Sequence, residues 1–166
     1  MKDDQMIEQK IGKFMIGVGC VMEHAATGKI LCLHRDRASY QKGDWEIMYG
    51  RIDQHEELLE ALRREVMEET GIEGFQIKRL LRIWHFYRGE KKAETEIHGF
   101  TFHCTTETQN IVLSSEHSEY RWVSPEEALD LVTVAGIRED VRFFIENQTN
   151  RKVALSGVSD KIEHIL

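Results

Sequence analysis

The first part of the chain alternates short apolar runs with polar turns. Residues 14–22 (FMIGVGCVM) and 30–34 have strand-like composition, and the turn around Gly28 lies between them, so we expect a hairpin. A polar loop follows at residues 36–44. A brief strand is then expected at residues 45–47.

The middle of the chain predicts a second hairpin. Residues 76–88 hold alternating apolar side chains, and so do residues 95–105, which alternate more regularly. The charged turn at residues 89–93 separates the two segments and would join them as antiparallel partners. A further short strand is expected at residues 119–123, just before the one proline of the chain.

The strongest helical pattern lies between these hairpins, at residues 56–69. This segment has no proline or glycine and is rich in leucine, alanine, glutamate and arginine, which are strong helix formers. An apolar stripe recurs every four residues along it, made by Leu58, Leu62 and Val66. Gly71 is placed to end the helix as a left-handed C-cap, and Gly50 and Asp53 are expected in a polar loop before it.

Two more helices are predicted in the last third of the chain. Ser124, Pro125 and the acids that follow them form a helix start, and this helix should run to about residue 132. A second helix is expected at residues 137–147, where apolar residues recur at helical spacing. Paired strands with three interspersed helices predict an α+β sandwich.

The length of 166 residues suits a single domain, residues 1–166. Its core should lie at about residues 14–147, after a polar N-terminal segment of 12 residues. The tail at residues 149–166 is weakly patterned, although residues 152–155 could add an edge strand. We find no internal repeat and no low-complexity stretch in the sequence.

Composition narrows the class of protein. Hydrophobic residues make up 41% and charged residues 31%, as in ordinary globular proteins, and no apolar run approaches the length of a membrane span. The polar, acidic start is not expected to be a signal peptide. Three cysteines without CxxC spacing indicate neither a disulfide framework nor a zinc site, so a reducing cytoplasm is expected. These cysteines are Cys20, Cys32 and Cys104.

Charge narrows the class of partner. The net charge of −7, with no lysine or arginine cluster, argues against broad binding of nucleic acid. A phosphorylated small molecule remains compatible with this charge, because bound metal ions would offset the repulsion between acids and phosphates. Whether the chain forms a homodimer stays open at this point.

Three glutamates crowd one edge of the predicted helix's buried face. At about 100° per residue, Glu65 and Glu69 fall beside the apolar stripe, and Glu68 lies one step further round. Glu65 and Glu69 form an unfavourable i,i+4 pair, and two of the acids lie near the negative end of the helix dipole. A cation would offset these penalties, and hard oxygen ligands suit Mg²⁺ or Mn²⁺. A solvated acidic face paired to Arg63 and Arg64 is the alternative.

The stretch from Gly50 to Ile72 reads GRIDQHEELLEALRREVMEETGI. It resembles the signature of the Nudix hydrolase family, G-x5-E-x7-R-E-U-x-E-E-x-G-U with U aliphatic, and it matches at every defined position. The resemblance implies an α/β/α sandwich with a mixed β-sheet over roughly residues 14–147. It also implies a metal-dependent pyrophosphohydrolase, acting on acid anhydrides, that cleaves a nucleoside diphosphate linked to another group.

The resemblance also assigns roles by position. The metal ligands that it implies are Glu65, Glu68, Glu69 and the backbone carbonyl of Tyr49. Glu65 would be either a ligand or the general base, and Arg64 would orient the glutamates through its planar fork. Glu56 would support Arg64 or the outer coordination of the metal. The positions with a structural role are Gly50, Glu56 and Gly71.

Relatives of this kind often use another acid from a distant loop. Glu116, in the stretch SSEHSEYRW, is the first candidate for a general base here, and Glu119 is the second. Glu94 and Glu96 are weaker candidates, and any of these acids could equally be a surface residue. His117 is expected to be a surface loop residue rather than a catalytic base.

Substrate preference is weakly marked in the sequence. Many relatives carry a proline before the first glycine of the signature, and this chain has Met48 and Tyr49 there instead. The subgroup markers that need a proline are missing, because Pro125 is the only one. By elimination we expect a nucleoside triphosphate or a similar small diphosphate compound. The expected substrate contacts are Arg35, Trp45, Trp84 and Tyr87, with core packing as the alternative for the aromatic residues.

Two other functions remain open. One is a nucleotide-sensing module that binds a nucleotide without cleaving it. Such a module would tolerate a degraded acid cluster, whereas the acid cluster of this sequence is intact. The other is an enzyme that resembles isopentenyl-diphosphate isomerase. That chemistry needs a catalytic thiol, and Cys104 is its only plausible source.

Overall fold

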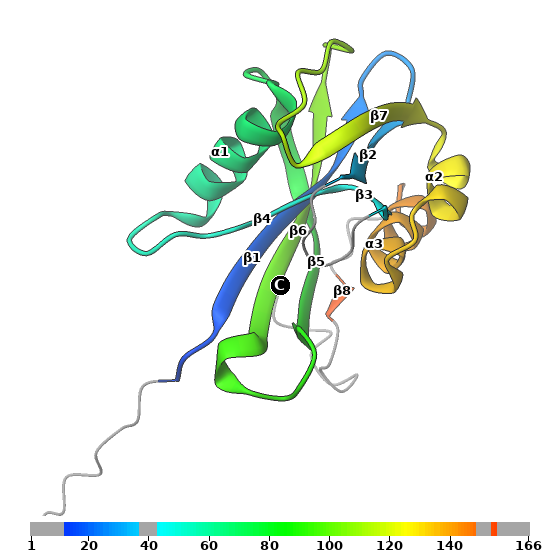
Figure 1. Cartoon of the computed structure of the whole chain (residues 1–166). Helices are drawn as coiled ribbons and strands as arrows, with labels where there is room; N and C mark the ends of the chain where they lie inside the picture. The colour runs from blue at the N-terminus through cyan, green and yellow to red at the C-terminus, as the bar shows by residue number, and fades with distance from the viewer. Residues whose placement is uncertain (1–11, 37–42, 149–153, 156–166) are drawn as a thin grey trace, which may run out of the picture.

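The computed structural model describes residues 12–36, 43–148 and 154–155 of the chain (Figure 1). The strands in chain order are β1 (Met15–His24), β2 (Ile30–Arg35), β3 (Trp45–Glu46), β4 (Met48–Arg51), β5 (Gln76–Tyr87), β6 (Glu96–Thr106), β7 (His117–Val123) and β8 (Ala154–Leu155). The helices are α1 (Leu58–Thr70), α2 (Pro125–Leu131) and α3 (Ala135–Glu146), with a short 3-10 helix at Ala93–Thr95. None of the described helices is long and apolar enough to cross a membrane.

The strands form one mixed sheet in the order β3-β2-β1-β6-β5-β8, with β4 paired to β1 and β7 paired to β2. The β1–β6 and β5–β8 pairs are parallel, and the other pairs are antiparallel. Both predicted hairpins are present. In the first, β1 meets β2 only near Glu23 and Ile30, because β4 occupies the rest of that edge of β1.

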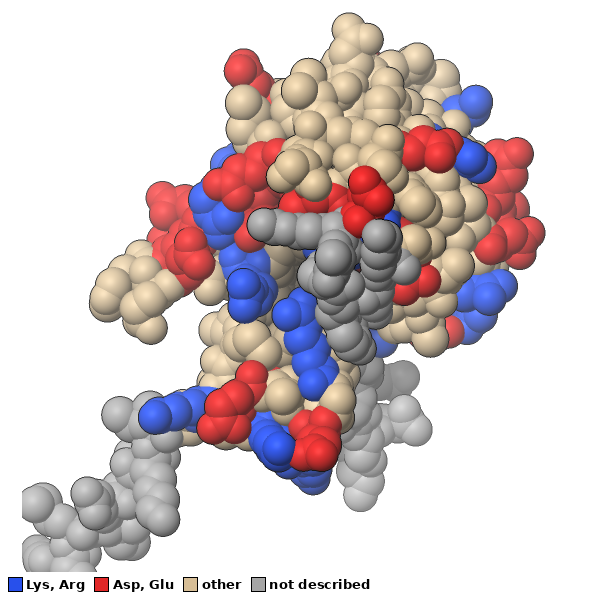
Figure 2. Space-filling view, in the orientation of Figure 1, with Lys and Arg blue, Asp and Glu red and all other residues tan. Residues whose placement is uncertain are grey.

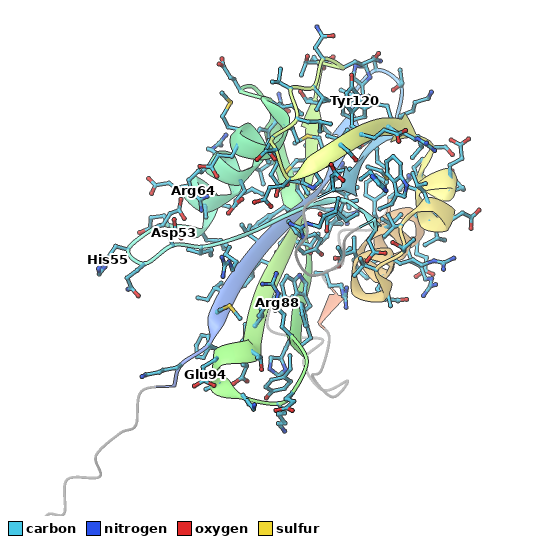
Figure 3. The ribbon with its side chains drawn as sticks, in the orientation of Figure 1. Asp53, His55, Arg64, Arg88, Glu94 and Tyr120 are labelled. Carbon is cyan, nitrogen blue, oxygen red and sulfur yellow. The ribbon has the colours of Figure 1, made fainter. Side chains whose placement is uncertain are left out.

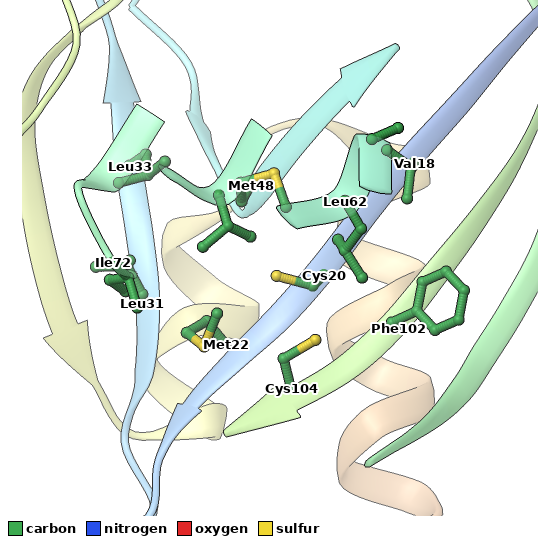
Figure 4. Packing of buried hydrophobic residues seen from close by; sticks show 12 residues of the cluster. Val18, Cys20, Met22, Leu31, Leu33, Met48, Leu62, Ile72, Phe102 and Cys104 are labelled. Atoms are coloured by element: carbon green, nitrogen blue, oxygen red, sulfur yellow. The ribbon is translucent and has the colours of Figure 1, made fainter. Parts of the chain in front are cut away.

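Helices cover the sheet on two sides, with α1 on one face and α2 and α3 on the other (Figure 1). One core cluster packs Leu62 and Val66 of α1 against the sheet, and a second packs Val141 and Phe144 of α3 against its other face. Figure 4 shows the first cluster, with Leu62 close to the β1 residues. The predicted α+β fold, an α/β/α sandwich, is therefore confirmed.

Strand β1 is buried on both faces of the sheet, which explains why its sequence is almost uniformly apolar. Val18, Cys20 and Met22 belong to the cluster beneath α1, and Val21 belongs to the cluster beneath α2 and α3. A strand buried on both faces needs apolar side chains at successive positions. The apolar run at the start of the pattern thus marks the centre of the sheet.

The signature segment differs from its prediction in two places. Helix α1 begins at Leu58, because Glu56 is used in the loop before it, where its side chain accepts a hydrogen bond from the backbone N–H of Asp53 at 2.9 Å. Gly50 lies in strand β4 opposite Val18, and not in the polar loop expected for it. The predicted C-cap at Gly71 is confirmed, since its φ of 68° is left-handed.

The last elements agree with the pattern. Ser124 caps α2 with a reciprocal hydrogen bond to Glu127, which forms a capping box. Strand β8 falls inside the expected edge strand and pairs with β5 in parallel. The rest of that segment, most of the polar N-terminal stretch and part of the predicted 36–44 loop lie outside the described residues.

Candidate active site

A cleft of about 900 Å³ opens between α1, β4, β5 and the start of α3. Its acidic lining residues are Glu46, Asp53, Glu65, Glu68, Glu69, Glu116 and Asp140, and its basic ones are Arg35, Arg51, Arg64, Arg82 and Arg88. In Figure 2, acidic side chains gather over α1 and basic side chains lie below them in the hollowed face. The cleft therefore places a carboxylate cluster beside guanidinium groups that could bind phosphate.

Glu69 is the most unusual acid of this cleft. Only 6% of it is exposed, and its Oε2 atom has no hydrogen-bond partner among the described residues. Burial, together with the charges of Glu46 and Glu65, raises the pKa of the Glu69 carboxyl well above its ordinary range. A buried, unpartnered carboxylate oxygen is costly, so the site has a place for a positive partner at Glu69.

Arg64 connects the other acids of the signature. Its Nε and Nη2 atoms donate to both oxygens of Glu56 at 2.7 and 2.9 Å, and its Nη1 donates to Glu65 and Glu68 at 3.0 and 3.1 Å. Nη2 also donates to the backbone carbonyl of Arg51 at 2.9 Å. The hydrogen bonds that Glu56 accepts from Arg64 and from the backbone N–H of Asp53 lower its pKa to about 2. One guanidinium thus contacts three carboxylates and the end of β4. Figure 3 labels Arg64 on α1.

Glu65 packs against Gly50. A Cβ atom on residue 50 would lie 1.9 Å from the carboxylate carbon of Glu65, which no side chain could tolerate. The same carboxylate accepts a hydrogen bond from the backbone N–H of Arg51 at 3.0 Å. The first glycine of the signature is therefore needed for close approach of the helix to β4.

Glu116 lies just before β7, in the turn that precedes it, and lines the cleft. Arg35 donates to Glu116 at 3.2 Å, and its Nε lies 3.4 Å from a Glu46 oxygen. The prediction that His117 is a surface loop residue is wrong. It begins β7 with a fully buried side chain, and its Nε2 lies 3.1 Å from Glu46. Pairing of β7 with β2 pulls this residue inward, so it is not a surface loop residue.

The sequence pattern did not reveal a buried network behind β4. The hydroxyl of Tyr49 donates to Asp140, a residue of α3 that is fully buried, and lies 2.9 Å from the hydroxyl of Thr101. Arg82 donates to the same aspartate at 2.7 Å. An acid between the apolar residues Ile137 and Val141 of one helix face was the available signal. Burial raises the pKa of the Asp140 carboxyl.

Two of the four expected substrate contacts line the cleft. Trp84 lines it and donates its indole N–H to Thr101 at 3.0 Å, and Arg35 lines it beside Glu116. Trp45 lies elsewhere, packed at the α2–α3 cluster with the guanidinium of Arg121 4.6 Å from its ring centroid. Tyr87 is also outside the cleft lining.

The weaker base candidates also lie away from the cleft lining. Glu119 pairs with Arg121 at 2.8 Å on β7, as expected for a strand residue with a committed side chain. Glu96 is bonded to His85 at 2.9 Å. Glu94 lies in the 3-10 helix of the β5–β6 turn. Glu116 is thus the one loop acid among these candidates that lines the cleft.

The carboxylate oxygens around Glu69 are suitable ligands for a hard divalent cation. The carboxylates of Glu65, Glu68 and Glu69 share the α1 edge of the cleft, and all of their donor atoms are oxygens. Mg²⁺ and Mn²⁺ prefer such ligands. A cation here would also provide the partner that the Glu69 Oε2 atom does not have among the described residues.

Comparisons with known proteins agree with this geometry. The family model described as NUDIX domain matches residues 13–142. Nucleoside triphosphatase NudI of Escherichia coli is 26% identical over 121 residues, which are 68% of this chain and 84% of that protein. RNA pyrophosphohydrolase of Bartonella henselae is 28% identical over 114 residues, and this match spans 58% of the chain and 65% of that protein, less than two thirds of it.

Solved structures show the same fold. The MutT protein of Methanosarcina mazei superposes with a TM-score of 0.67 at 28% identity, covering 84% of this chain and 99% of that one. The dihydroneopterin triphosphate pyrophosphohydrolase of E. coli has a TM-score of 0.64 at 21% identity, covering 83% and 99%, which shows the fold alone. Because the family model spans most of the described residues and the complete signature lines one side of the cleft, the chain belongs to the Nudix hydrolase family.

Proposed function

We propose that the chain is a Mg²⁺- or Mn²⁺-dependent hydrolase that cleaves a diphosphate linkage in a nucleoside triphosphate or a similar small molecule. The observation that carries this proposal is the Glu69 carboxylate, which is buried at the edge of the cleft with one oxygen unpartnered among the described residues. Without a cation, the carboxylates of Glu65 and Glu69 would repel each other there, because they are four residues apart on one helix. With one, they become a ligand set for phosphoryl chemistry.

In this proposal, the residues of the signature segment hold the metal and orient its ligands. Glu65, Glu68 and Glu69, with the backbone carbonyl of Tyr49, would hold the metal, which polarises phosphoryl oxygens and lowers the pKa of water when bound. Arg64 keeps the carboxylates in place through the hydrogen bonds described above. These side chains are fixed on a helix and a strand, so little reorganisation is needed when substrate enters.

Glu116 is our candidate for the general base. It faces the cleft from the β7 side, while the signature acids lie on α1, so it could take a proton from water on another side of the phosphorus. Arg35 would position this carboxylate through its 3.2 Å bond. Glu65 remains the alternative base, because it lies in the same cleft.

The substrate class rests on the other half of the cleft. Arg82 and Arg88 could bind phosphate oxygens, and Trp84 and Phe86, stacked at 5.3 Å, offer an aromatic surface near them. The relatives named above act, by their names, on nucleoside triphosphates and on RNA. The net charge of −7 favours the small nucleotide over a long polyanion.

The isomerase alternative loses support from the position of Cys104. This thiol is fully buried in the cluster beneath α1 and does not line the cleft, so it could not reach a bound diphosphate.

All three cysteines are free and buried, which supports the expectation of a reducing cytoplasm.

A substrate screen tests the proposal and separates it from the nucleotide-sensing alternative. Nucleoside triphosphates and other nucleoside diphosphate compounds are incubated with Mg²⁺, and release of phosphate or pyrophosphate is measured beside nucleotide binding by calorimetry. We expect turnover of at least one triphosphate. Tight binding with no product from any of the compounds would favour the sensor.

A further inference from the structure

A second cluster of metal-ligating side chains lies outside the acid cluster of α1. It consists of His85 on β5 and Glu96 and His98 on β6, whose ligand atoms all lie within 4.8 Å of one another. The Nε2 atom of His85 is 2.9 Å from Glu96 Oε1, and that of His98 is 3.6 Å from the same oxygen. The cluster lies toward the β5–β6 turn, where Figure 3 labels Glu94.

The strand ladder places these side chains on one face. His85 is directly opposite His98, and Tyr87 is directly opposite Glu96 on the next same-facing rung. The two imidazole rings stack with centroids 4.4 Å apart and planes at 24°, so both rings present Nε2 to the same carboxylate. Backbone pairing along the whole hairpin therefore fixes the spacing of the three side chains.

Neighbouring groups hold the cluster in place. The hydroxyl of Tyr87 donates to Glu96 Oε1 at 3.2 Å, and the ring of Phe14 meets the edge of His98 at a centroid distance of 4.9 Å. Such outer contacts orient metal ligands in known sites. His98 is the least committed ligand, because its 3.6 Å separation from the carboxylate exceeds hydrogen-bond distance.

We propose that His85, Glu96 and His98 form a second metal site, which takes a borderline divalent cation such as Zn²⁺. Two imidazole nitrogens and one carboxylate oxygen match the ligand preferences of zinc, whereas the oxygen-only cluster of α1 suits Mg²⁺. Three protein ligands leave a fourth position for water or a phosphate oxygen. His85 also lines the cleft, whereas Glu96 and His98 do not, so this site lies beside the cleft and is separate from the α1 acid cluster.

Cobalt spectroscopy on the whole chain tests this site without measuring activity. Co²⁺ gives strong visible absorption in a four-coordinate nitrogen and oxygen site and weak absorption in a six-coordinate oxygen site, so the two clusters are distinguishable. We expect one equivalent of Co²⁺ to give the strong band and Zn²⁺ to displace it. His98→Ala and Glu96→Gln should each weaken binding by at least about tenfold.

His103→Ala provides the matched control. His103 lies on the same strand and pairs with Glu23 at 2.7 Å, so it is a histidine–glutamate pair without a second histidine. Its loss should leave the Co²⁺ band unchanged. The proposal is overturned if no strong band appears, if the band survives in a His98→Ala/Glu96→Gln double variant, or if His103→Ala removes it equally.

Discussion

At the scale of single residues, Glu69 is a buried acid of the candidate site whose charged form is disfavoured. An ionised carboxylate is poorly solvated in a position that is 6% exposed, and the charges of Glu46 and Glu65 add to the cost. The fold accepts this penalty at one end of its signature helix. We interpret this as a lower free energy of unfolding of the metal-free protein in return for a site that can bind a cation.

Removing the Glu69 charge should therefore stabilise the metal-free protein. Because the folded-state pKa of Glu69 is raised above its ordinary 4.5, the folded state holds a proton that the unfolded state releases. The contribution of this group to stability consequently falls as pH rises above about 4.5, through the raised pKa. We expect Glu69→Gln to raise Tm at neutral pH, by about 2–4 °C per kcal/mol regained, and to flatten this fall.

Thermal melts in chelator from pH 5 to pH 8 would measure the effect, with Glu60→Gln as control. Glu60 is an exposed acid in the first turn of the same helix. If Glu69→Gln melts lower than the wild type at neutral pH, the carboxylate is stabilising and this account of it is wrong.

Arg64→Lys should not behave as a conservative change. Lysine keeps the charge but cannot hold Glu56 with two nitrogens while also reaching Glu65. We expect metal affinity and kcat to fall by about 10- to 100-fold. A Mn²⁺ titration followed by electron paramagnetic resonance measures the affinity. Arg63→Lys is the neighbouring control, and equal titration curves for all three proteins would contradict the orienting role.

Glu116→Gln tests the base. The variant keeps the shape of the side chain and loses its proton-accepting charge, so kcat should fall while KM changes little. The alkaline rise of the pH–rate profile should also flatten. Glu119→Gln, on the adjacent strand, is the control. A kcat within about twofold of wild type for Glu116→Gln, with Glu65→Gln inactive, would move the base to α1.

At the scale of elements, β4 is held between α1 and α3. Gly50 and Arg51 contact Glu65 of α1, and Tyr49 reaches Asp140 of α3 through its hydroxyl. The tyrosine lies in β4, at the position before the signature glycine where many relatives have a proline. We infer that the buried hydrogen bond from its hydroxyl to Asp140 restrains the position of β4 against α3.

Tyr49→Phe should loosen this restraint. Loss of the hydroxyl removes one partner of a fully buried aspartate, which costs about 1–3 kcal/mol of stability. Because the adjoining carbonyl is an expected metal ligand, Mn²⁺ binding should weaken as well. Urea unfolding and Mn²⁺ titration measure the two effects. Tyr120→Phe, a partly exposed tyrosine on β7 (Figure 3), should change neither, and a silent Tyr49→Phe would contradict the restraint.

Periodicity was enough to predict most elements, because strands and helices bury one face or two with regular spacing. It could not place Gly50 in a strand, since a four-residue strand is too short for a period and depends on pairing with β1. It also misplaced His117, whose burial follows from the long-range pairing of β7 with β2. Local patterns do not contain such partners.

At the scale of the whole molecule, the cleft brings together distant parts of the sequence. The signature glutamates share one helix and could be identified as a cluster from helical spacing. Arg82 and Asp140 come from β5 and α3, and only the folded sheet brings them beside Tyr49. Trp45 shows the reverse case, since an aromatic residue in a suitable segment packs at the α2–α3 cluster instead of the cleft.

At this scale, the charge distribution is the reason why the proposed function needs a metal ion. Substrate phosphates would approach a cleft that contains an acid cluster in a protein with a net charge of −7. The arginines on the other side of the cleft offset part of this repulsion, and a divalent cation at Glu69 would offset the rest. Hydrolysis and metal binding should therefore be coupled through Glu69.

The most direct test is the rate of nucleoside triphosphate hydrolysis as a function of Mg²⁺ concentration, compared among the wild type, Glu69→Gln and Glu60→Gln. We expect no product in excess chelator and saturable activation by Mg²⁺ in the wild type and in Glu60→Gln. In Glu69→Gln the hydrolysis rate should fall by at least about a hundredfold. Full hydrolysis in chelator, or an unchanged Mg²⁺ response in Glu69→Gln, would contradict this expectation.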